Sequence, residues 1–323
     1  MSEFNHLPQS PETPSPHDLK IIKALLGDEV AAKYEGAEVK TERTKDAGYK
    51  PSEEDINAVH EATENSKEFE KNAENTKRQW MEWADKFSVD KKHIEESANF
   101  KENGDVVWVG NFNFSGKGLT ELPPNFTLLE GNFICPDNKL TNLVNSPKKV
   151  TGNFVCNCNL LTSLKGSPIE VGGDFRCSIN KLTSLSSNLK KVGKIFYCDN
   201  NMLTNLIGSP EVGESFMCDY NVLTSLEGAP QNLKYNFSCN HNQLRSLEGA
   251  PKKVEVFCCR NNQLSSVVKG PTDVARIFDC RKNKDLKDFS TEINVGEDIF
   301  VSPDQIELIK NLRKKGYTFQ VLI

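Results

Sequence analysis

The sequence predicts an α+β fold: a solenoid of short parallel strands, with a helical region before it and a small helix-strand cap after it. Two observations predict this fold: a series of cysteines 20 or 21 residues apart, and helix signals on either side of the series. A phenylalanine stands two residues before each of these cysteines, and an asparagine stands three residues after it. A fixed period of this length indicates stacked repeats, which offer a long surface rather than a single cleft. The repeat cysteines are Cys135, Cys156, Cys177, Cys198, Cys218, Cys239, Cys259 and Cys280.

Each residue type in the repeat has a physical reason. In the pattern Phe-x-Cys the two side chains lie on the same face of a strand, because side chains alternate along a strand. A free cysteine then serves as a small buried hydrophobe beside each ring. The asparagine lies where the chain leaves the strand, and its amide can both donate and accept hydrogen bonds. Proline and glycine in the second half of the repeat keep the return leg extended and irregular.

The core of the repeat, F-x-C-x-x-N-x-L-x-x-L, resembles the leucine-rich-repeat consensus L-x-L-x-x-N-x-L over about residues 104–301. The resemblance implies a right-handed solenoid of about nine or ten turns, with the strands on its concave side and the asparagines turned inward as a ladder. These 20–21-residue Phe/Cys/Asn repeats are also similar to arrays in bacteriophage and other microbial proteins. That similarity implies a phage-encoded factor that acts in the host cytoplasm.

The chain before the repeats divides into two parts. Residues 1–16 are rich in proline and serine and predict a disordered arm. Residues 17–100 predict a helical region, because apolar residues recur in it at helical spacing. Its longest helix carries an apolar stripe that ends in Trp80, Trp83 and Phe87. Two interpretations stay open: this helix packs on its own domain, or it oligomerises as a coiled coil.

Residues 302–323 predict a C-terminal cap, which a solenoid needs because its last turn exposes an apolar edge. Ser302 is expected as the N-cap of a helix, with Pro303 at the first helical position and Gln305 completing a capping box. The helix is expected to end near Gly316, and the remaining residues are expected to form a strand.

Composition argues against several classes of partner. The net charge of −5 divides into 14 basic and 22 acidic residues over 1–100 and a balance of +3 over the rest. Neither part has the clustered Lys and Arg of a nucleic-acid interface, and no run approaches the roughly 18 apolar residues of a membrane span. No export signal is visible, and buried thiols favour a reducing compartment, so a cytoplasmic location is expected. No metal or cofactor is expected, because the neighbouring pairs Cys156 with Cys158 and Cys258 with Cys259 lack the C-x-x-C spacing of a structural zinc site.

The best candidates for a binding surface are residues that the repeat pattern does not dictate. On the middle turns these are aromatic residues, Met, Ile, Arg and Asp, a composition typical of interface hot spots. They could equally be scattered surface residues, which are common. The later turns become basic through Arg260, Arg281 and Lys282. The predicted partner-binding residues are Arg176, Ile179, Tyr197, Asp199, Met217, Asp219 and Tyr220.

No catalytic motif appears in the sequence, and the five histidines are scattered, so no catalytic residue is predicted. The repeats also resemble those of secreted bacterial effectors, some of which are ubiquitin ligases, but only a short cap follows them here. An effector enzyme is therefore the weakest alternative. The sequence favours a protein-binding adaptor or inhibitor, and the second alternative is a structural virion component that assembles through the N-terminal helix. The oligomeric state stays open.

Overall fold

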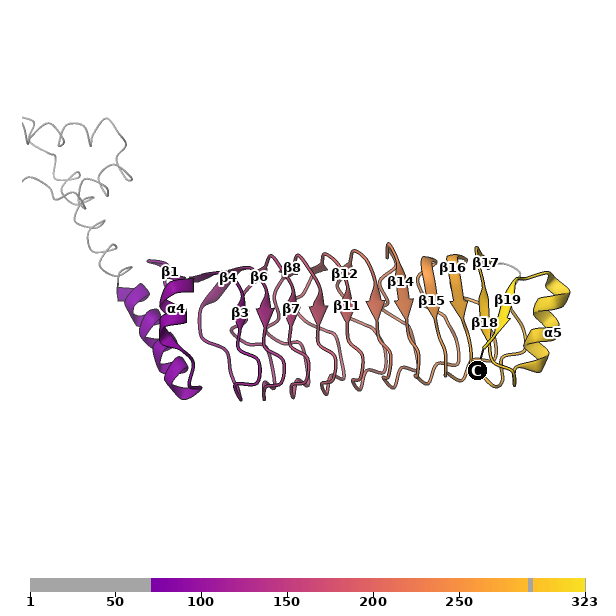
Figure 1. The fold of residues 1–323 in the computed structure, drawn as a ribbon, viewed down its shortest axis with the longest axis horizontal. Helices are drawn as coiled ribbons and strands as arrows, with labels where there is room; N and C mark the ends of the chain where they lie inside the picture. The colour runs from indigo at the N-terminus through magenta and orange to yellow at the C-terminus, as the bar shows by residue number, and fades with distance from the viewer. Residues whose placement is uncertain (1–70, 290–292, 323) are drawn as a thin grey trace, which may run out of the picture. The chain divides into compact units, whose positions relative to one another are not determined.

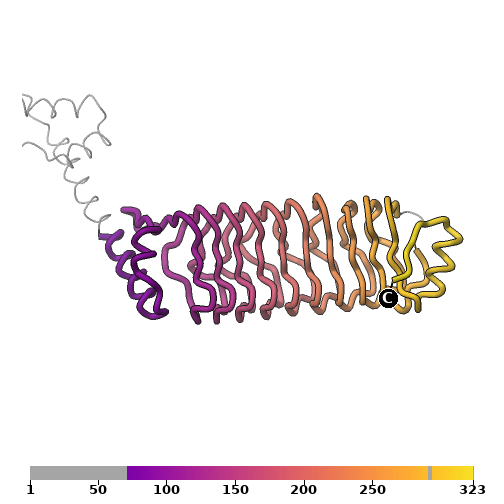
Figure 2. Tube along the Cα trace, viewed as in Figure 1, coloured from indigo at the N-terminus to yellow at the C-terminus, as the bar shows by residue number. Residues whose placement is uncertain are grey.

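The structure is a computed structural model that describes residues 71–289 and 293–322. The predicted arm and the helical region up to residue 70 lie outside the described residues. Residues 75–323 form one compact unit. This unit is a leucine-rich-repeat solenoid of about 10 turns, which confirms the predicted fold class. Figure 2 shows the turns stacked one after another, with the colour advancing steadily along the stack.

Successive turns of the solenoid contribute short strands to a parallel sheet of 12 strands within the described residues. Phe196 pairs with Phe175 on one side and with Phe216 on the other, so the register of the repeat is also the register of the sheet. The strands are β3 (Phe112–Asn113), β5 (Phe133–Ile134), β7 (Phe154–Val155), β9 (Phe175–Arg176), β11 (Phe196–Tyr197), β13 (Phe216–Met217), β14 (Asn236–Ser238), β15 (Lys253–Cys258), β16 (Asp273–Asp279), β17 (Asn294–Val295), β18 (Ile299–Val301) and β19 (Phe319–Val321). Strands β17 and β18 both pair with β16, and β19 belongs to the cap.

A second sheet, with seven strands in the described residues, lies upstream of the first in each repeat (Figure 1). Its first strand is antiparallel to the next, and the others are parallel. The strands are β1 (Ala98–Phe100), β2 (Val106–Val109), β4 (Phe126–Glu130), β6 (Lys149–Val150), β8 (Glu170–Val171), β10 (Lys191–Val192) and β12 (Glu211–Val212).

The last turns of the second sheet, which stops at β12, approach each other closely at glycine. A Cβ added to Gly193 would lie 2.2 Å from the carbonyl oxygen of Gly172, and a Cβ on Gly213 would lie 2.2 Å from that of Gly193. Lys234 stands at the next equivalent position. A hollow lined in part by Asn232 lies beside β12.

The core is a continuous column of phenylalanines, which confirms the predicted inward face. The rings from Phe133 to Phe257 stack nearly parallel, with successive centroids 4.3 to 5.8 Å apart. The eight repeat cysteines are fully buried and free. Most of their thiols lie within hydrogen-bond distance of a carbonyl oxygen of the following turn, as Cys198 Sγ does at 3.3 Å from Met217 O.

The repeat asparagines form the expected ladder inside the turns. Asn201 Nδ2 lies 3.2 Å from Cys177 O of the preceding turn and 3.1 Å from Cys198 O of its own turn. Asn201 Oδ1 accepts a hydrogen bond from the backbone nitrogen of Leu182 at 3.0 Å. Each amide therefore connects two turns through backbone groups that would otherwise be buried without a partner.

The N-terminal end of the solenoid is closed by the helical stretch of residues 71–86. Trp80 and Trp83 are buried there, and their indole nitrogens donate to the carbonyl oxygens of Pro124 and Glu121. The aromatic end of the predicted stripe thus packs on its own solenoid, which agrees with the interpretation that the helix packs on its own domain. A short helix, α4 (Lys91–Ser97), and strand β1 follow, and neither was predicted from the sequence.

The C-terminal cap contains the predicted helix and strand with different bounds. Helix α5 (Ile306–Lys315) begins after Gln305 rather than after Ser302, and it ends at Gly316 in the left-handed conformation. The predicted start is wrong because Ser302 Oγ accepts a hydrogen bond from the Lys282 backbone nitrogen instead of capping the helix. Strand β19 pairs with β18.

Gln305 ends the asparagine ladder. Its Nε2 donates to Cys280 O and to Asn283 O, both at 3.0 Å, and its Oε1 accepts from the Ser302 backbone nitrogen at 2.7 Å. The side chain is 2% exposed, and it occupies the place that the asparagine of a further turn would take. One glutamine thereby satisfies the last open backbone groups of the repeat.

Candidate partner-binding face

The candidate face consists of the outward side chains of the 12-stranded sheet and of the turn that follows each strand. The predicted row of Arg176, Tyr197 and Met217 exists, because these residues pair directly on adjacent strands β9, β11 and β13. All three are partly exposed. Adjacent strands lie about 4.8 Å apart, so these side chains form one continuous strip.

Arg176 is held in a fixed orientation within this strip. Its Nη2 lies 2.8 Å from the Asp174 carboxylate, and its guanidinium carbon lies 4.8 Å from the centre of the Tyr197 ring. Burial raises the pKa of the Tyr197 hydroxyl, so the ring is neutral at physiological pH. A cation over an aromatic face is a compact and preorganised contact surface.

The residue directly before each ladder asparagine has a left-handed backbone conformation. The φ values at these positions lie between 52° and 56°. A β-branched side chain is strained in this conformation, yet Ile179 adopts it at φ 56° and is 55% exposed. Tyr220 adopts it at φ 52° and is 50% exposed. Core packing does not explain these two residues, whereas strained residues do cluster at functional sites.

The two predicted aspartates are already engaged by donors of the protein itself. Asp219 Oδ1 accepts from Ser238 Oγ and from the Asn240 backbone nitrogen, each at 2.7 Å. Asp199 Oδ1 accepts from the Asp219 backbone nitrogen at 3.0 Å, and its Oδ2 accepts from Ser178 Oγ at 3.2 Å. Burial and the nearby Asp219 charge raise the pKa of the Asp199 carboxyl. These carboxylates therefore connect turns, and they offer less to a partner than their sequence position suggested.

The predicted set of binding residues missed three exposed apolar residues, each at the position directly after a ladder asparagine. Met202 is 54% exposed and Val222 is 37% exposed, on adjoining turns beside Ile179 and Tyr220. Leu160 occupies the same position on an earlier turn. The sequence could have indicated these residues, since the residue after the asparagine varies from turn to turn while the leucine that follows it does not. We call Ile179, Met202, Tyr220 and Val222 the apolar patch.

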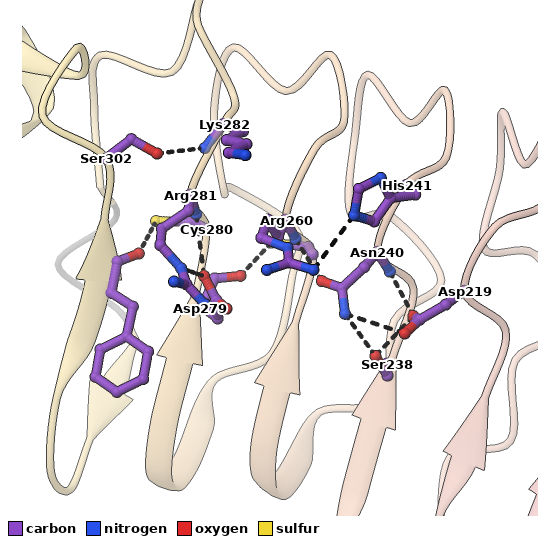
Figure 3. Close-up of polar contacts among 12 residues, drawn as sticks. Asp219, Ser238, Asn240, His241, Arg260, Asp279, Cys280, Arg281, Lys282 and Ser302 are labelled. Atoms are coloured by element: carbon purple, nitrogen blue, oxygen red, sulfur yellow. Dashed lines mark hydrogen bonds and ion pairs between the residues drawn. The ribbon is translucent and has the colours of Figure 1, made fainter. Parts of the chain in front are cut away.

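A polar cluster adjoins the apolar patch on the later turns (Figure 3). The Tyr220 ring stacks on the His241 ring with centroids 4.2 Å apart, and His241 Nε2 lies 3.3 Å from Arg260 Nη2. Burial, together with the positive charges of Arg260 and Lys282, lowers the pKa of the His241 imidazole. Asn261 Nδ2 lies 2.8 Å from His241 Nδ1, and because a guanidinium and an amide nitrogen can only donate, the neutral ring accepts from one of the two neighbours and not from both.

The two extra thiols of the face have raised pKa values, and its described residues form no cluster of metal ligands. Within the described residues, no group of three or more His, Cys, Asp or Glu side chains is placed to hold a metal ion. Burial raises the pKa of the Cys258 thiol to about 12, so this cysteine is protonated and a poor nucleophile. Burial and the Asp137 charge also raise the pKa of the Cys158 thiol. No helix among the described residues is long and apolar enough to cross a membrane.

No family model and no curated protein matches this chain. Among solved structures, the chain is similar to YopM from Yersinia enterocolitica WA-314, with 20% sequence identity and a TM-score of 0.43. The match covers 66% of this chain and 46% of the YopM chain, which is less than half of that protein.

Proposed function

We propose that the protein is a non-enzymatic binding module, an adaptor or inhibitor that engages another protein through the outward side of the 12-stranded sheet, the side expected to be concave. Solenoids typically use such extended surfaces for binding. One observation carries the proposal. Large apolar side chains are exposed at neighbouring turns, and one of them, Ile179, keeps a strained left-handed backbone while more than half exposed.

The strain argues against a purely structural role for the apolar patch. Asparagine is tolerated in the left-handed conformation and occupies the same position at Asn200 and Asn261. Isoleucine and tyrosine at that position gain nothing from the core, since both side chains point to solvent. Aromatic and aliphatic anchors do contribute to binding energy when a partner covers them. Partner binding therefore gives a reason for residues that folding alone does not favour.

This difference allows binding to be separated from folding. We expect the double variant Ile179→Asn, Tyr220→Asn to melt at or above the temperature of the wild-type chain, because asparagine suits φ near 55°. The same variant should lose partner capture in affinity purification from native host cells. Asp137→Asn is the matched control, because it changes the same left-handed position on an outlying turn. Capture at wild-type level by the double variant would refute the proposed face.

A cytoplasmic location is a further part of this proposal, and it is supported by ten free cysteines, since such thiols persist in reducing compartments. A bacteriophage origin rests on the sequence resemblance of the repeats. The alternative of a virion component would require self-assembly through the N-terminal helix, whose described aromatic end packs on the solenoid. Light scattering coupled to size-exclusion chromatography tests it, because a clean monomer would exclude that role.

A further inference from the structure

The later turns present an arginine that no acceptor of the described residues neutralises. Within that part of the chain, Arg260 makes no ion pair, and its buried Nε has no hydrogen-bond partner. The nearest carboxylates are occupied. Asp279 accepts two hydrogen bonds from Arg281, at 2.9 Å and 2.7 Å, and Asp219 is held by Ser238. Figure 3 shows Arg260 between Asp279 and Asp219, whose carboxylates already accept these hydrogen bonds.

The side-chain partner of the Arg260 guanidinium is the neutral imidazole of His241, at 3.3 Å. A hydrogen bond to a neutral acceptor is weaker than one to a carboxylate. If the guanidinium rotated onto a bound carboxylate, only the weak hydrogen bond to His241 would be lost. The buried Nε–H would gain an acceptor. Lys282 adds a second exposed cation on the next turn, and the structure shows no ion pair for it among the described residues.

We propose that Arg260, with His241 and Lys282 beside it, receives an acidic side chain from an extended segment of the protein partner. This inference rests on the proposed function and adds the chemistry of the partner. The neighbouring apolar patch would receive an apolar side chain of the same segment. The occupant is thus an acidic and apolar peptide, chosen because its charge complements the unneutralised cations and its apolar side chain complements the exposed patch.

The repeat geometry also sets the spacing of the two anchors in the partner. The turns that carry Tyr220 and Arg260 are separated by two steps along the solenoid, or about 10 Å at about 4.8 Å per step. An extended peptide advances about 3.3 Å per residue. The acidic residue should therefore lie about three residues from the apolar or aromatic residue that contacts Tyr220.

A display library of random peptides, selected on the full chain, provides a probe that does not require the partner to be identified. We expect selected peptides to be enriched in Asp or Glu about three residues from a large apolar residue. Synthetic peptides of that sequence should bind Arg260→Asn at least about tenfold more weakly than wild type, as expected for the loss of a charge-assisted hydrogen bond. Arg245→Asn removes the same charge from an exposed site elsewhere, and it should change Kd less than about twofold.

A pH titration provides a second readout that a structural role would not produce. Protonated His241 would attract a bound carboxylate, so binding should tighten as pH falls below the ordinary histidine pKa of about 6.5, because the pKa of the unbound ring is lowered. The charges that act on this ring are Asp219, Arg260 and Lys282, and burial opposes its protonation. His241→Asn keeps a residue suited to the left-handed backbone and should remove this pH dependence.

The outcomes separate this inference from the proposed function. Selection of no peptide, or of peptides without acidic enrichment, would overturn the acidic subsite. Peptides that depend on Tyr220 but bind Arg260→Asn normally would also overturn it, and they would leave the apolar face as the partner site. Peptides that bind the double variant Ile179→Asn, Tyr220→Asn normally would count against the proposed function itself.

Discussion

Replacing one asparagine of the ladder should lower the free energy of unfolding by the contribution of several buried hydrogen bonds. Asn201 Nδ2 lies within 3.2 Å of the carbonyl oxygens of Cys177, Cys198 and Asp199, while its Oδ1 accepts from the Leu182 backbone nitrogen at 3.0 Å. An amide has two hydrogens, so at most two of the three donor contacts are full hydrogen bonds. With the accepted bond, Asn201→Ala loses three hydrogen bonds and leaves buried groups unpaired, at about 3–5 kcal/mol in total.

An isosteric variant isolates the donor half of this interaction. Asn201→Asp keeps an oxygen for Leu182 but turns a carboxylate toward carbonyl oxygens, which raises the pKa of the introduced group above its unfolded value of about 3.9. The folded state then binds the proton more tightly than the unfolded state. This variant should therefore be most stable below about pH 4 and lose stability as pH rises through the folded pKa.

Urea denaturation followed by far-ultraviolet circular dichroism at several pH values would measure both effects. Asn200→Gly is the matched control, since it changes the adjacent exposed amide at φ 54°, a conformation that glycine adopts freely. We expect the control to unfold close to the wild-type midpoint at every pH. The ladder would not stabilise the fold as argued if Asn201→Ala had the same urea midpoint as the control. The same would follow if the urea midpoint of Asn201→Asp did not change with pH.

Three further predictions concern the core. Phe196→Ala should destabilise by about 3–5 kcal/mol because it empties a place in the ring column, whereas Tyr197→Ala should cost little. Equal losses of melting temperature would reverse the assignment of inward and outward faces. Gly193→Ala should destabilise by about 1–3 kcal/mol through overlap with the neighbouring carbonyl oxygen, and unchanged stability would show that the turns can separate freely. Thiol labelling of the folded chain should modify Cys158 before any buried repeat cysteine, so fast modification of Cys198 would contradict the register.

Features that repeat could be predicted from the sequence, because each turn has the same neighbours. Phe196 packs between two copies of itself, and Asn201 bonds the same backbone groups as every other ladder asparagine. Features that occur once could not be predicted in this way. Gln305 continues the ladder from outside the repeat pattern, and nothing in its local sequence distinguishes that role from helix capping.

The candidate site was predicted less completely than the fold, for a physical reason. An outward side chain can contact solvent, a partner or the next turn, and the residue type alone does not decide among them. Asp219 looked like a charged anchor, but its hydrogen bonds depend on Ser238 and Asn240 of the following turn. Met202 was overlooked because it follows the asparagine, beyond the strand and turn positions from which binding residues were predicted.

A run of side-chain hydrogen bonds between turns ends at Arg260. At its repeat position, Asp199, Asp219 and Asn240 each accept a hydrogen bond from the backbone nitrogen of the same position on the next turn. Arg260 cannot accept, so the Arg281 backbone nitrogen is within bonding distance of Asp279 Oδ1 instead, at 3.2 Å.

The run of hydrogen bonds therefore ends at the residue whose guanidinium lacks a carboxylate partner. Arg260→Asn would restore an acceptor of the kind found at Asn240, so we expect thermal stability equal to or above that of wild type. The same variant should bind the selected acidic peptides more weakly. A clear loss of thermal stability in Arg260→Asn would mean that the arginine stabilises the fold. The hydrogen bonds between turns would then give no support to a role of Arg260 in binding. Stability retained with binding lost would show that the arginine stands where the solenoid has given up a structural contact for recognition.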